Sequence, residues 1–350
     1  MAIDLSDYHI HAGDWRGNLK RNQRRTVIVI AAFVLIYVAI GFLIDFYLQS
    51  TVNQPPPPAL ALIKALLTFQ IIPYATLIAA GVAIVAVLVT FAFHDKLMLL
   101  GADYILISAD SASNLQEKQL YNIVEEMKVA AGLAYLPKIY IIEADYMNAF
   151  ASGYSEKSAM LAITRGLLTK LDRDELTAVM AHEISHIRHM DIKLTLMASV
   201  LANITQIMID ILFWNLFMSG RGDRDGEKRN NSLFLIVLVL RYVFPLLTVV
   251  LMMYLSRSRE YMADAGCVEL MRSNEPLARA LLKIQGDHEE NSAQYASAYT
   301  NTPHESIRRQ AYIFEPLSAG INAHKSISDF FSTHPNIADR LKAMGIEQKK

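Results

Sequence analysis

One cysteine in 350 residues, Cys267, excludes an intrachain disulfide framework. Charge is also scarce: Asp, Glu, Lys and Arg make up 19% of the chain, and a net charge of −1 gives no indication of a nucleic-acid partner. No repeat of the length used by solenoids is present. Apolar residues are abundant instead. They make up 53% of the chain, with a mean hydropathy of +0.24, which indicates a membrane protein rather than a soluble enzyme.

Long apolar runs predict four transmembrane helices, at residues 26–48, 71–93, 194–218 and 233–255. As a helix the first run is roughly 34 Å long, enough to cross a bilayer. A secretory signal peptide would have a shorter apolar core, so we interpret this run as an uncleaved anchor. The last two runs contain several polar residues. They could alternatively lie partly in the membrane interface or pack on the soluble part of the chain.

Basic residues predict the orientation of these helices, because cytoplasmic flanks are enriched in Lys and Arg. Lys64 is the only basic residue between the first two runs. The N-terminus and the residues after 93 are therefore expected to be cytoplasmic. Five basic residues precede the first run: Arg16, Lys20, Arg21, Arg24 and Arg25.

The last two runs each carry one charge, at similar distances from the turn that joins them. These charges are Asp210 and Arg241. An unpaired charge inside a membrane is costly, so the two are predicted to form an ion pair. The alternative is that each faces a water-filled cleft separately.

The predicted fold class is mainly α (α+β), with a small β-sheet in the soluble part. The sequence predicts helices at residues 114–131, 275–285, 307–314 and 335–344, and strands at 138–142 and 158–164. Residues 148–153 suit a loop or a bulged strand edge. The predicted domain organisation is an N-terminal segment (1–25), a two-span anchor (26–93), a first soluble part (94–192), a second hairpin of spans (193–256) and a second soluble part (257–350).

The segment that organises the chain is the HExxH pattern formed by His182, Glu183 and His186. On a helix the two histidines lie one turn apart on the same face, so both imidazoles can reach one metal ion. Glu183 projects beside them, where a carboxylate can take a proton from water. A capping box at Asp172 and Glu175 predicts that this segment is helical.

A catalytic zinc takes three protein ligands, and Glu260 is the candidate for the third. It lies on the same predicted side of the membrane as the HExxH segment. Asp264 follows one turn later on the same helical face, where its carboxylate could orient a ligating histidine. The alternative is that Glu260 and its basic neighbours form only a charged collar next to the membrane.

Several ordered motifs together resemble the integral-membrane zinc metallopeptidases, in particular the HtpX-like heat-shock proteases, with the CaaX prenyl endopeptidases as more distant relatives. HtpX-like chains usually have only a few residues before the first span, whereas about 25 precede it here. The motifs are HEISH followed by Asp191, Glu260-Tyr261-Met262-Ala263-Asp264, Asn148-Ala149-Phe150, and Ser332-Thr333-His334-Pro335 with Arg340.

This resemblance implies a zincin-like catalytic domain with one Zn²⁺ per chain. The implied zinc ligands are His182, His186 and Glu260, with Glu183 as general base. His334 and Arg340 are implied to approach the site as catalytic residues. The implied substrate-binding residues are Asn148 and Ala149, and the residues that would orient the ligands are Asp191 and Asp264.

The activity implied is hydrolysis of misfolded or damaged membrane proteins at the cytoplasmic face of the bacterial inner membrane. The expected partners are protein substrates and the lipid bilayer. Two alternatives stay open at this point: a peptidase for prenylated CaaX proteins, and a non-catalytic membrane scaffold or transporter. Short links between the motifs and the last two runs further predict a site within about 10 Å of the membrane surface.

Overall fold

The computed structural model of the chain describes residues 3, 5–11, 13–52, 57–99, 103–153, 155–219, 231–295, 312–314 and 334–349. The chain divides into two compact units. We call them the sheet unit (Met1–Thr26, Phe91–Leu194 and Met253–Lys350) and the helical unit (Val27–Thr90 and Thr195–Met252). The domain boundaries expected from the sequence stay a prediction.

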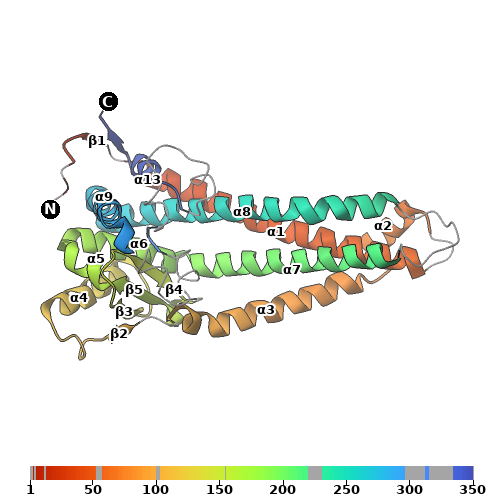
Figure 1. The fold of residues 1–350 in the computed structure, drawn as a ribbon, viewed down its shortest axis with the longest axis horizontal. Coiled ribbons are helices and arrows are strands. Elements are labelled where there is room, and N and C mark those ends of the chain that lie inside the picture. The colour runs from red at the N-terminus through yellow and green to blue at the C-terminus, as the bar shows by residue number, and fades with distance from the viewer. Residues whose placement is uncertain are drawn as a thin grey trace. The chain divides into compact units, whose positions relative to one another are not determined.

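The described residues are mainly helical with small sheets, which confirms the predicted fold class (Figure 1). The elements of the first half are β1 (Tyr8–Ile10), α1 (Trp15–Val52), α2 (Ala59–Leu67), α3 (Tyr74–Leu99), β2 (Tyr104–Ile107), α4 (Leu115–Ala131), β3 (Lys138–Ile142), β4 (Ala149–Ser152) and η1 (Glu156–Ser158). Those that follow are β5 (Met160–Thr164), α5 (Arg165–Lys170), α6 (Arg173–Arg188), α7 (Asp191–Ser219), α8 (Asn231–Met271), α9 (Glu275–Glu290), α13 (Ile337–Ala343) and β6 (Ile346–Gln348).

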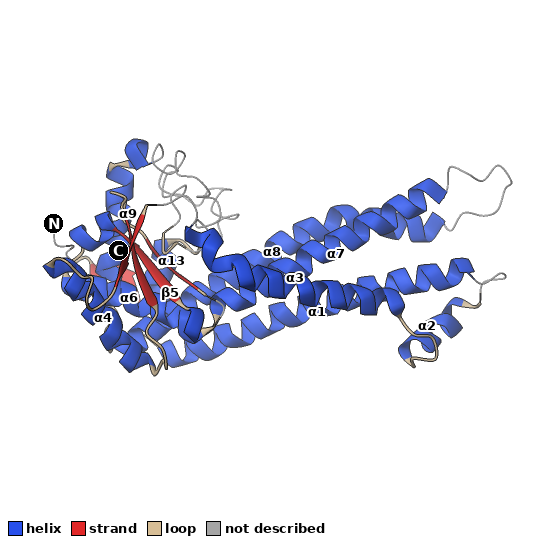
Figure 2. Cartoon of the chain, turned by 90° about the horizontal axis from the view of Figure 1, so that it is seen from below, coloured by secondary structure: helices blue, strands red, loops and turns tan. Residues whose placement is uncertain are grey.

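The sheet unit contains a four-stranded sheet in the order β2-β3-β5-β4 (Figure 2). Strands β3 and β5 are parallel, and the other pairs are antiparallel. One face of this sheet, including Ile139, Ile141, Leu161 and Ile163, belongs to a buried core shared with α4, α6 and α9. The predicted strand 138–142 is confirmed. The second strand starts at Met160 because the preceding residues form the turn η1.

Of the segment 148–153, expected to be a loop or a bulged strand edge, residues 149–152 form β4, which lies at an edge of the described sheet. The predicted helix 114–131 is α4. Asn114 accepts a hydrogen bond from the Glu117 N–H at its start, and Gly132 ends it in the left-handed conformation at φ 71°. Of the predicted helix 307–314, residues 307–311 lie outside the described part, and 312–314 are not helical, because their backbone groups bond elsewhere.

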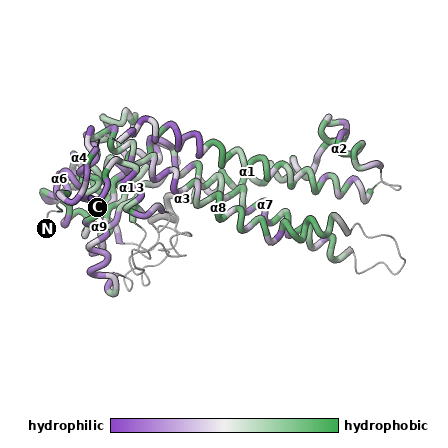
Figure 3. The backbone as a smooth tube through the Cα atoms, turned by 90° about the horizontal axis from the view of Figure 1, so that it is seen from above, coloured by the Kyte–Doolittle hydropathy of each residue, from purple (hydrophilic) through white to green (hydrophobic). Residues whose placement is uncertain are grey.

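Three described helices are long and apolar enough to cross a membrane: Trp15–Val52, Lys193–Met218 and Leu233–Met271. Figure 3 shows their apolar stretches in green. The second predicted span, residues 71–93, starts later than expected. Helix α3 begins at Tyr74, directly after Pro73, and its described apolar part, Tyr74–Thr90, is shorter than the other three.

Within the helical unit, α1, α3, α7 and α8 share a core that includes Tyr37, Ala83, Ile209 and Phe244. Asp45, the only charge in the first predicted span, caps α3. Its two carboxylate oxygens accept hydrogen bonds from the N–H groups of Ala75 and Thr76, at 2.8 and 3.0 Å. A helix N-terminus stabilises a carboxylate in this position, so the charge is compensated inside an apolar unit.

The predicted ion pair between the last two spans is confirmed. Arg241 Nε lies 3.0 Å from Asp210 Oδ1. The guanidinium also lies over the Phe213 ring, 4.2 Å from its centroid.

Exchanging these two charges tests the energetic weight of the pair. Asp210→Arg or Arg241→Asp alone is expected to lower the free energy of unfolding by about 3 kcal/mol, because like charges then face each other in an apolar unit. The double exchange is expected to recover most of this loss. Unfolding of the four proteins in detergent micelles measures it, and a double variant no more stable than the single ones would exclude a direct pair.

Candidate active site

The HExxH segment lies on α6, as its predicted capping box requires. The Asp172 carboxylate accepts a hydrogen bond from the Glu175 N–H at 2.9 Å, and the Glu175 carboxylate accepts one from the Asp172 N–H at 3.0 Å. The Lys283 ammonium of α9 also donates to Glu175, at 2.9 Å. These contacts fix the first turn of α6. From there the helix runs through the core, so that His182 and His186 are both buried.

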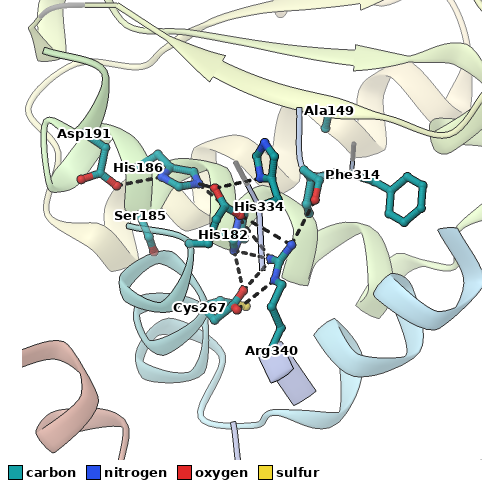
Figure 4. A network of polar contacts seen from close by, with 12 residues as sticks. Ala149, His182, Ser185, His186, Asp191, Cys267, Phe314, His334 and Arg340 are labelled. Atoms are coloured by element: carbon teal, nitrogen blue, oxygen red, sulfur yellow. Dashed lines mark hydrogen bonds and ion pairs between the residues drawn. The ribbon is translucent and has the colours of Figure 1, made fainter. Parts of the chain in front are cut away.

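The structure brings the three predicted ligands together from α6 and α8. The two imidazole Nε2 atoms of His182 and His186 lie 3.2 Å apart (Figure 4). Each is 3.6 Å from one carboxylate oxygen of Glu260. The ligand atoms of all three residues lie within 4.8 Å of one another. Two imidazoles and a carboxylate are a donor set that catalytic zinc uses.

A carboxylate lies behind each histidine. Asp264 Oδ1 is 3.0 Å from His182 Nδ1, and Asp191 Oδ2 is 2.8 Å from His186 Nδ1. Both contacts fix the ring so that Nε2 faces the centre of the cluster. Burial lowers the pKa of His182, but its hydrogen bonds with Asp264 and Glu260 outweigh burial and raise it to about 9. The side chains alone thus create a centre that attracts a cation.

The carboxylates around the histidines are held in their charged form. Burial would raise the pKa of Asp191, but the Arg259 guanidinium, 3.3 Å away, and the hydrogen bond with His186 lower it. Burial likewise opposes ionisation of Glu260, yet His334 and His182 hold its pKa well below the usual range. Glu260 is therefore ionised, as a metal ligand must be.

Glu183 lies beside the ligands and is 1% exposed. Among the described residues, neither of its carboxylate oxygens has a hydrogen-bond partner of normal geometry. Burial raises its pKa, while the charges of His182 and His186 and the backbone amide of Ala151 lower it. A buried carboxylate without partners costs stability, roughly 1–3 kcal/mol or more. These two orphaned oxygens fit a site that receives a metal ion together with a water molecule.

The C-terminal segment brings His334 and Arg340 to the cluster. His334 Nδ1 lies 3.5 Å from Glu260 Oε1. Arg340 is 1% exposed and binds Asp264 through two nitrogens, at 2.6 and 3.0 Å. It also lies 3.5 Å from Glu260 and donates to the Ile313 carbonyl at 3.0 Å. Arg340 thus holds Asp264 and lies beside Glu260, while the catalytic role expected from the sequence stays a prediction.

The predicted substrate-binding residues Asn148 and Ala149 lie at the edge of the sheet, but their polar groups contact the chain itself. The Asn148 amide donates to the Phe314 carbonyl at 2.9 Å. The Ala149 carbonyl accepts a hydrogen bond from the Ile313 N–H, also at 2.9 Å. Alternate residues of a strand direct their backbone groups to the same side, so Ala151 faces the same edge as Ala149. Ser332 and Thr333 of the last motif lie outside the described residues.

Two features of this site were not predicted from the sequence. Arg259 pairs with Asp191 and so contributes to holding His186; in the sequence it looks like one more charge of the juxtamembrane collar. The segment 312–314 bonds to β4 and to Arg340, and it carries no motif that would have indicated this. Its position next to Asn148 could be found only from the fold.

The apolar helices and the His/His/Glu cluster with its buried glutamate define the class of this protein: a membrane metallopeptidase. Residues 114–347 match the model of Peptidase family M48, and the chain belongs to this family.

Several curated relatives show the same relationship over nearly the whole chain. A Protease HtpX homolog of Helicobacter acinonychis (strain Sheeba) is 39% identical over 326 residues, which cover 93% of this chain and 96% of that protein. A Protease HtpX homolog of Helicobacter pylori (strain Shi470) is 38% identical with the same coverage. One from Listeria innocua is 31% identical over 339 residues, 92% of this chain and 96% of the relative.

A search of solved structures finds the crystal structure of S. mikatae Ste24p. It is 20% identical, with a TM-score of 0.47, and the match covers 80% of this chain and 60% of that chain.

Proposed function

We propose that this protein is a zinc-dependent endopeptidase of the bacterial inner membrane that cleaves misfolded or damaged membrane proteins at the cytoplasmic surface. The observation that carries the proposal is the convergence of His182, His186 and Glu260 around one point, with the buried carboxylate of Glu183 beside them, unbonded to any other described side chain. A structural metal site would have no need of a free buried carboxylate.

In this proposal His182, His186 and Glu260 hold one Zn²⁺. When bound, the ion supplies Lewis acidity for the scissile carbonyl and for the attacking water. Glu183 takes the proton of that water and later passes it to the leaving amine. His334, which lies near Glu260, is placed to donate to the developing oxyanion.

The substrate backbone is proposed to add along the edge of β4. In the described part of the sheet this strand lies at the edge, and extended peptides bind such edges through main-chain hydrogen bonds. The Ala149 carbonyl is already bonded to Ile313. Pairing therefore uses the backbone of Ala151, whose amide is near Glu183. This route needs an extended substrate segment, as unfolded or loosened proteins provide.

The membrane location supports the choice of substrate. Asp191 opens α7 and Glu260 is part of α8, and both helices also carry apolar runs able to cross a bilayer. The basic residues before the first span favour a cytoplasmic N-terminus, and with it a cytoplasmic site. A peptidase built this way would receive membrane proteins that have lost their fold.

Metal removal tests the proposal directly. The purified protein in vesicles is expected to cleave a destabilised membrane protein in preference to its folded form. A zinc chelator is expected to reduce cleavage by roughly 10²-fold or more, and added Zn²⁺ to restore it, because Lewis acidity is then lost and regained. Gel analysis of the fragments measures this. Full cleavage in excess chelator would contradict the metal requirement, and preferential cleavage of a prenylated C-terminal peptide would support the CaaX-type alternative.

A separate prediction concerns the carboxylate behind His186. Asp191→Asn is expected to weaken zinc binding by about 10–100-fold, because the amide no longer holds the ring or increases its basicity. Competition with a chromophoric chelator measures the affinity. Asp174→Asn, an exposed position of the same helix α6, is the matched control and is expected to bind zinc as the unchanged protein does. Equal affinity of the Asp191 variant would exclude an orienting role.

A further inference from the structure

The N-terminal segment, residues 5–11 and 13–18, lies against the C-terminal end of the chain (Figure 1). Strand β1 pairs with β6 in an antiparallel two-stranded sheet, with His9 opposite Glu347. The pairing continues beyond the strand, where the His11 N–H donates to the Gly345 carbonyl at 2.9 Å. Both segments belong to the sheet unit.

The N-terminal segment supplies hydrogen-bond partners to the end of α13, a helix that is too short to be stable alone. Helix α13 spans 7 residues, and the last carbonyls of any helix lack partners inside it. The Asn18 amide donates to the Ala343 carbonyl at 2.9 Å. The Asn274 amide donates both to the Met344 carbonyl at 2.8 Å and to the His11 carbonyl at 3.1 Å. Asn274 thus joins the N-terminal segment to the end of α13.

Glycine at position 13 permits the close approach of the N-terminal segment. A Cβ atom there would lie 2.6 Å from the Met344 carbonyl oxygen. The segment also covers α8. Gly13, Trp15 and Asn18 line a cavity of about 10 Å³ together with Asp264, a space for about one water molecule. The N-terminal segment is therefore packed tightly beside the carboxylate that holds His182.

Helix α13 carries Arg340, and Arg340 leads to the metal ligands. Its guanidinium binds Asp264 with two nitrogens, and Asp264 in turn contacts His182 Nδ1 at 3.0 Å. A shift of α13 would move Arg340, leave Asp264 without its partner and release the ring of His182. A displacement of about 1 Å in such a chain can cost about 10²-fold in rate.

We propose that residues 5–11 and 13–18, together with Asn274, form a positioning element for the peptidase site: they hold the end of α13, and so keep Arg340 on Asp264 and Asp264 on His182. This role rests on the proposed function, because peptide cleavage is one of the two quantities measured below. The other is the Co²⁺ spectrum, which does not depend on cleavage. It gives the segment before the first span a part in positioning the site, in addition to the orientation predicted from its basic residues.

Asn274→Ala is the first test, because it removes both amide contacts at once. Asn274 precedes α9 but makes no side-chain capping bond to it, so the substitution leaves the start of α9 unchanged. Asn291→Ala, at the other end of α9, removes one local hydrogen bond and is the matched control. In the full-length protein, kcat is expected to fall about 10-fold or more for Asn274→Ala, with KM within about twofold. The control is expected to keep both values.

The absorption spectrum of the Co²⁺-loaded protein supplies a readout independent of cleavage. Its ligand-field bands report the geometry of the metal ligands, so Asn274→Ala is expected to shift them and Asn291→Ala is not. Gly13→Ala is a second variant, expected to act in the same way through its contact with Met344. Its control is Gly286→Ala, where the added Cβ meets nothing within 4 Å.

A cross-link tests whether Asn274 acts by fixing the position of α13 rather than by stabilising the whole protein. His9 and Glu347 are paired and exposed, and a directly opposite pair of this kind suits a disulfide. His9→Cys with Glu347→Cys, oxidised in the Asn274→Ala background, is expected to restore kcat to within about twofold of the unchanged protein, since the restored position recovers the ligand geometry. The reduced form is expected to stay impaired. The remaining cysteine, Cys267, is buried and should not interfere.

Unchanged kcat and an unchanged Co²⁺ spectrum in both Asn274→Ala and Gly13→Ala would overturn the positioning role. So would impairment that the oxidised cross-link fails to repair. Glu183→Gln separates this inference from the proposed function. If Glu183→Gln is inactive while the Asn274 and Gly13 variants are normal, only the positioning role fails. If Glu183→Gln remains fully active, the proposed function itself is wrong.

Discussion

Glu183→Gln is expected to reduce cleavage by roughly 10²–10⁴-fold while the protein keeps its metal and its fold, because a positioned general base contributes about that factor. The amide has the same shape but cannot take a proton. Glu183 is buried and bonds to no other side chain among the described residues, and the side-chain oxygen of Gln can still face the Ala151 amide. Removing a buried charge is also expected to leave the free energy of unfolding unchanged or slightly higher.

This prediction is tested by measuring peptide cleavage, zinc content and thermal unfolding of the same preparation. Glu125→Gln, at an exposed position of α4, is the matched control and is expected to behave as the unchanged protein. Cleavage by Glu183→Gln within a few-fold of normal would show that another group acts as base. Loss of zinc together with activity would instead indicate that Glu183 holds the metal.

Glu260→Ala is expected to weaken zinc binding by more than about 100-fold, more than the loss of a residue that only orients a ligand. Two effects act together. One of three ligands disappears, and the positive charge of Arg340, which lies 3.5 Å from Glu260, is left facing the centre without that carboxylate. A site with this excess of positive charge repels a divalent cation.

Dialysis against a chelator, followed by measurement of bound zinc, tests the Glu260 prediction. Glu269→Ala, which lies further along the same helix α8 and pairs with Arg188 at 3.0 Å, is the matched control. It is expected to retain zinc. Tight zinc binding by the Glu260 variant would show that Glu260 is not a zinc ligand. The third ligand would then be another residue.

The core of the site could be predicted because its residues are close in sequence or lie on one helix. His182 and His186 are one turn apart on α6, and Glu260 and Asp264 are one turn apart on α8. Asp191 follows the HExxH segment after a short turn. Helical spacing alone places such residues on a common face. The capping box at the start of α6 predicted where that helix begins.

The contacts that could not be predicted join segments far apart in the chain. The Asn148 amide bonds to Phe314, and the Asn274 amide bonds to His11 and Met344. None of these pairs leaves a pattern in the sequence, because each depends on how the sheet unit folds. The strands β1 and β6 have 3 residues each, too few to show the alternation that reveals a strand.

In the helical unit, the partner of one charged pair could be predicted from the sequence, but the partner of Asp45 could not. The similar depth of Asp210 and Arg241 predicted their contact correctly. Asp45, alone in its run, offered no partner of opposite sign. Its partners are the N–H groups at the start of α3, which become available only once Pro73 has fixed where that helix begins.

The central claim is that His182, His186 and Glu260 together hold one zinc ion. X-ray absorption at the zinc edge of the purified protein tests it most directly. The predicted first shell contains two imidazole nitrogens at about 2.0–2.1 Å and oxygen atoms at about 2.0–2.2 Å, with no sulfur. A protein that binds no zinc, or a shell with sulfur at about 2.3 Å or with more than two imidazoles, would contradict the claim.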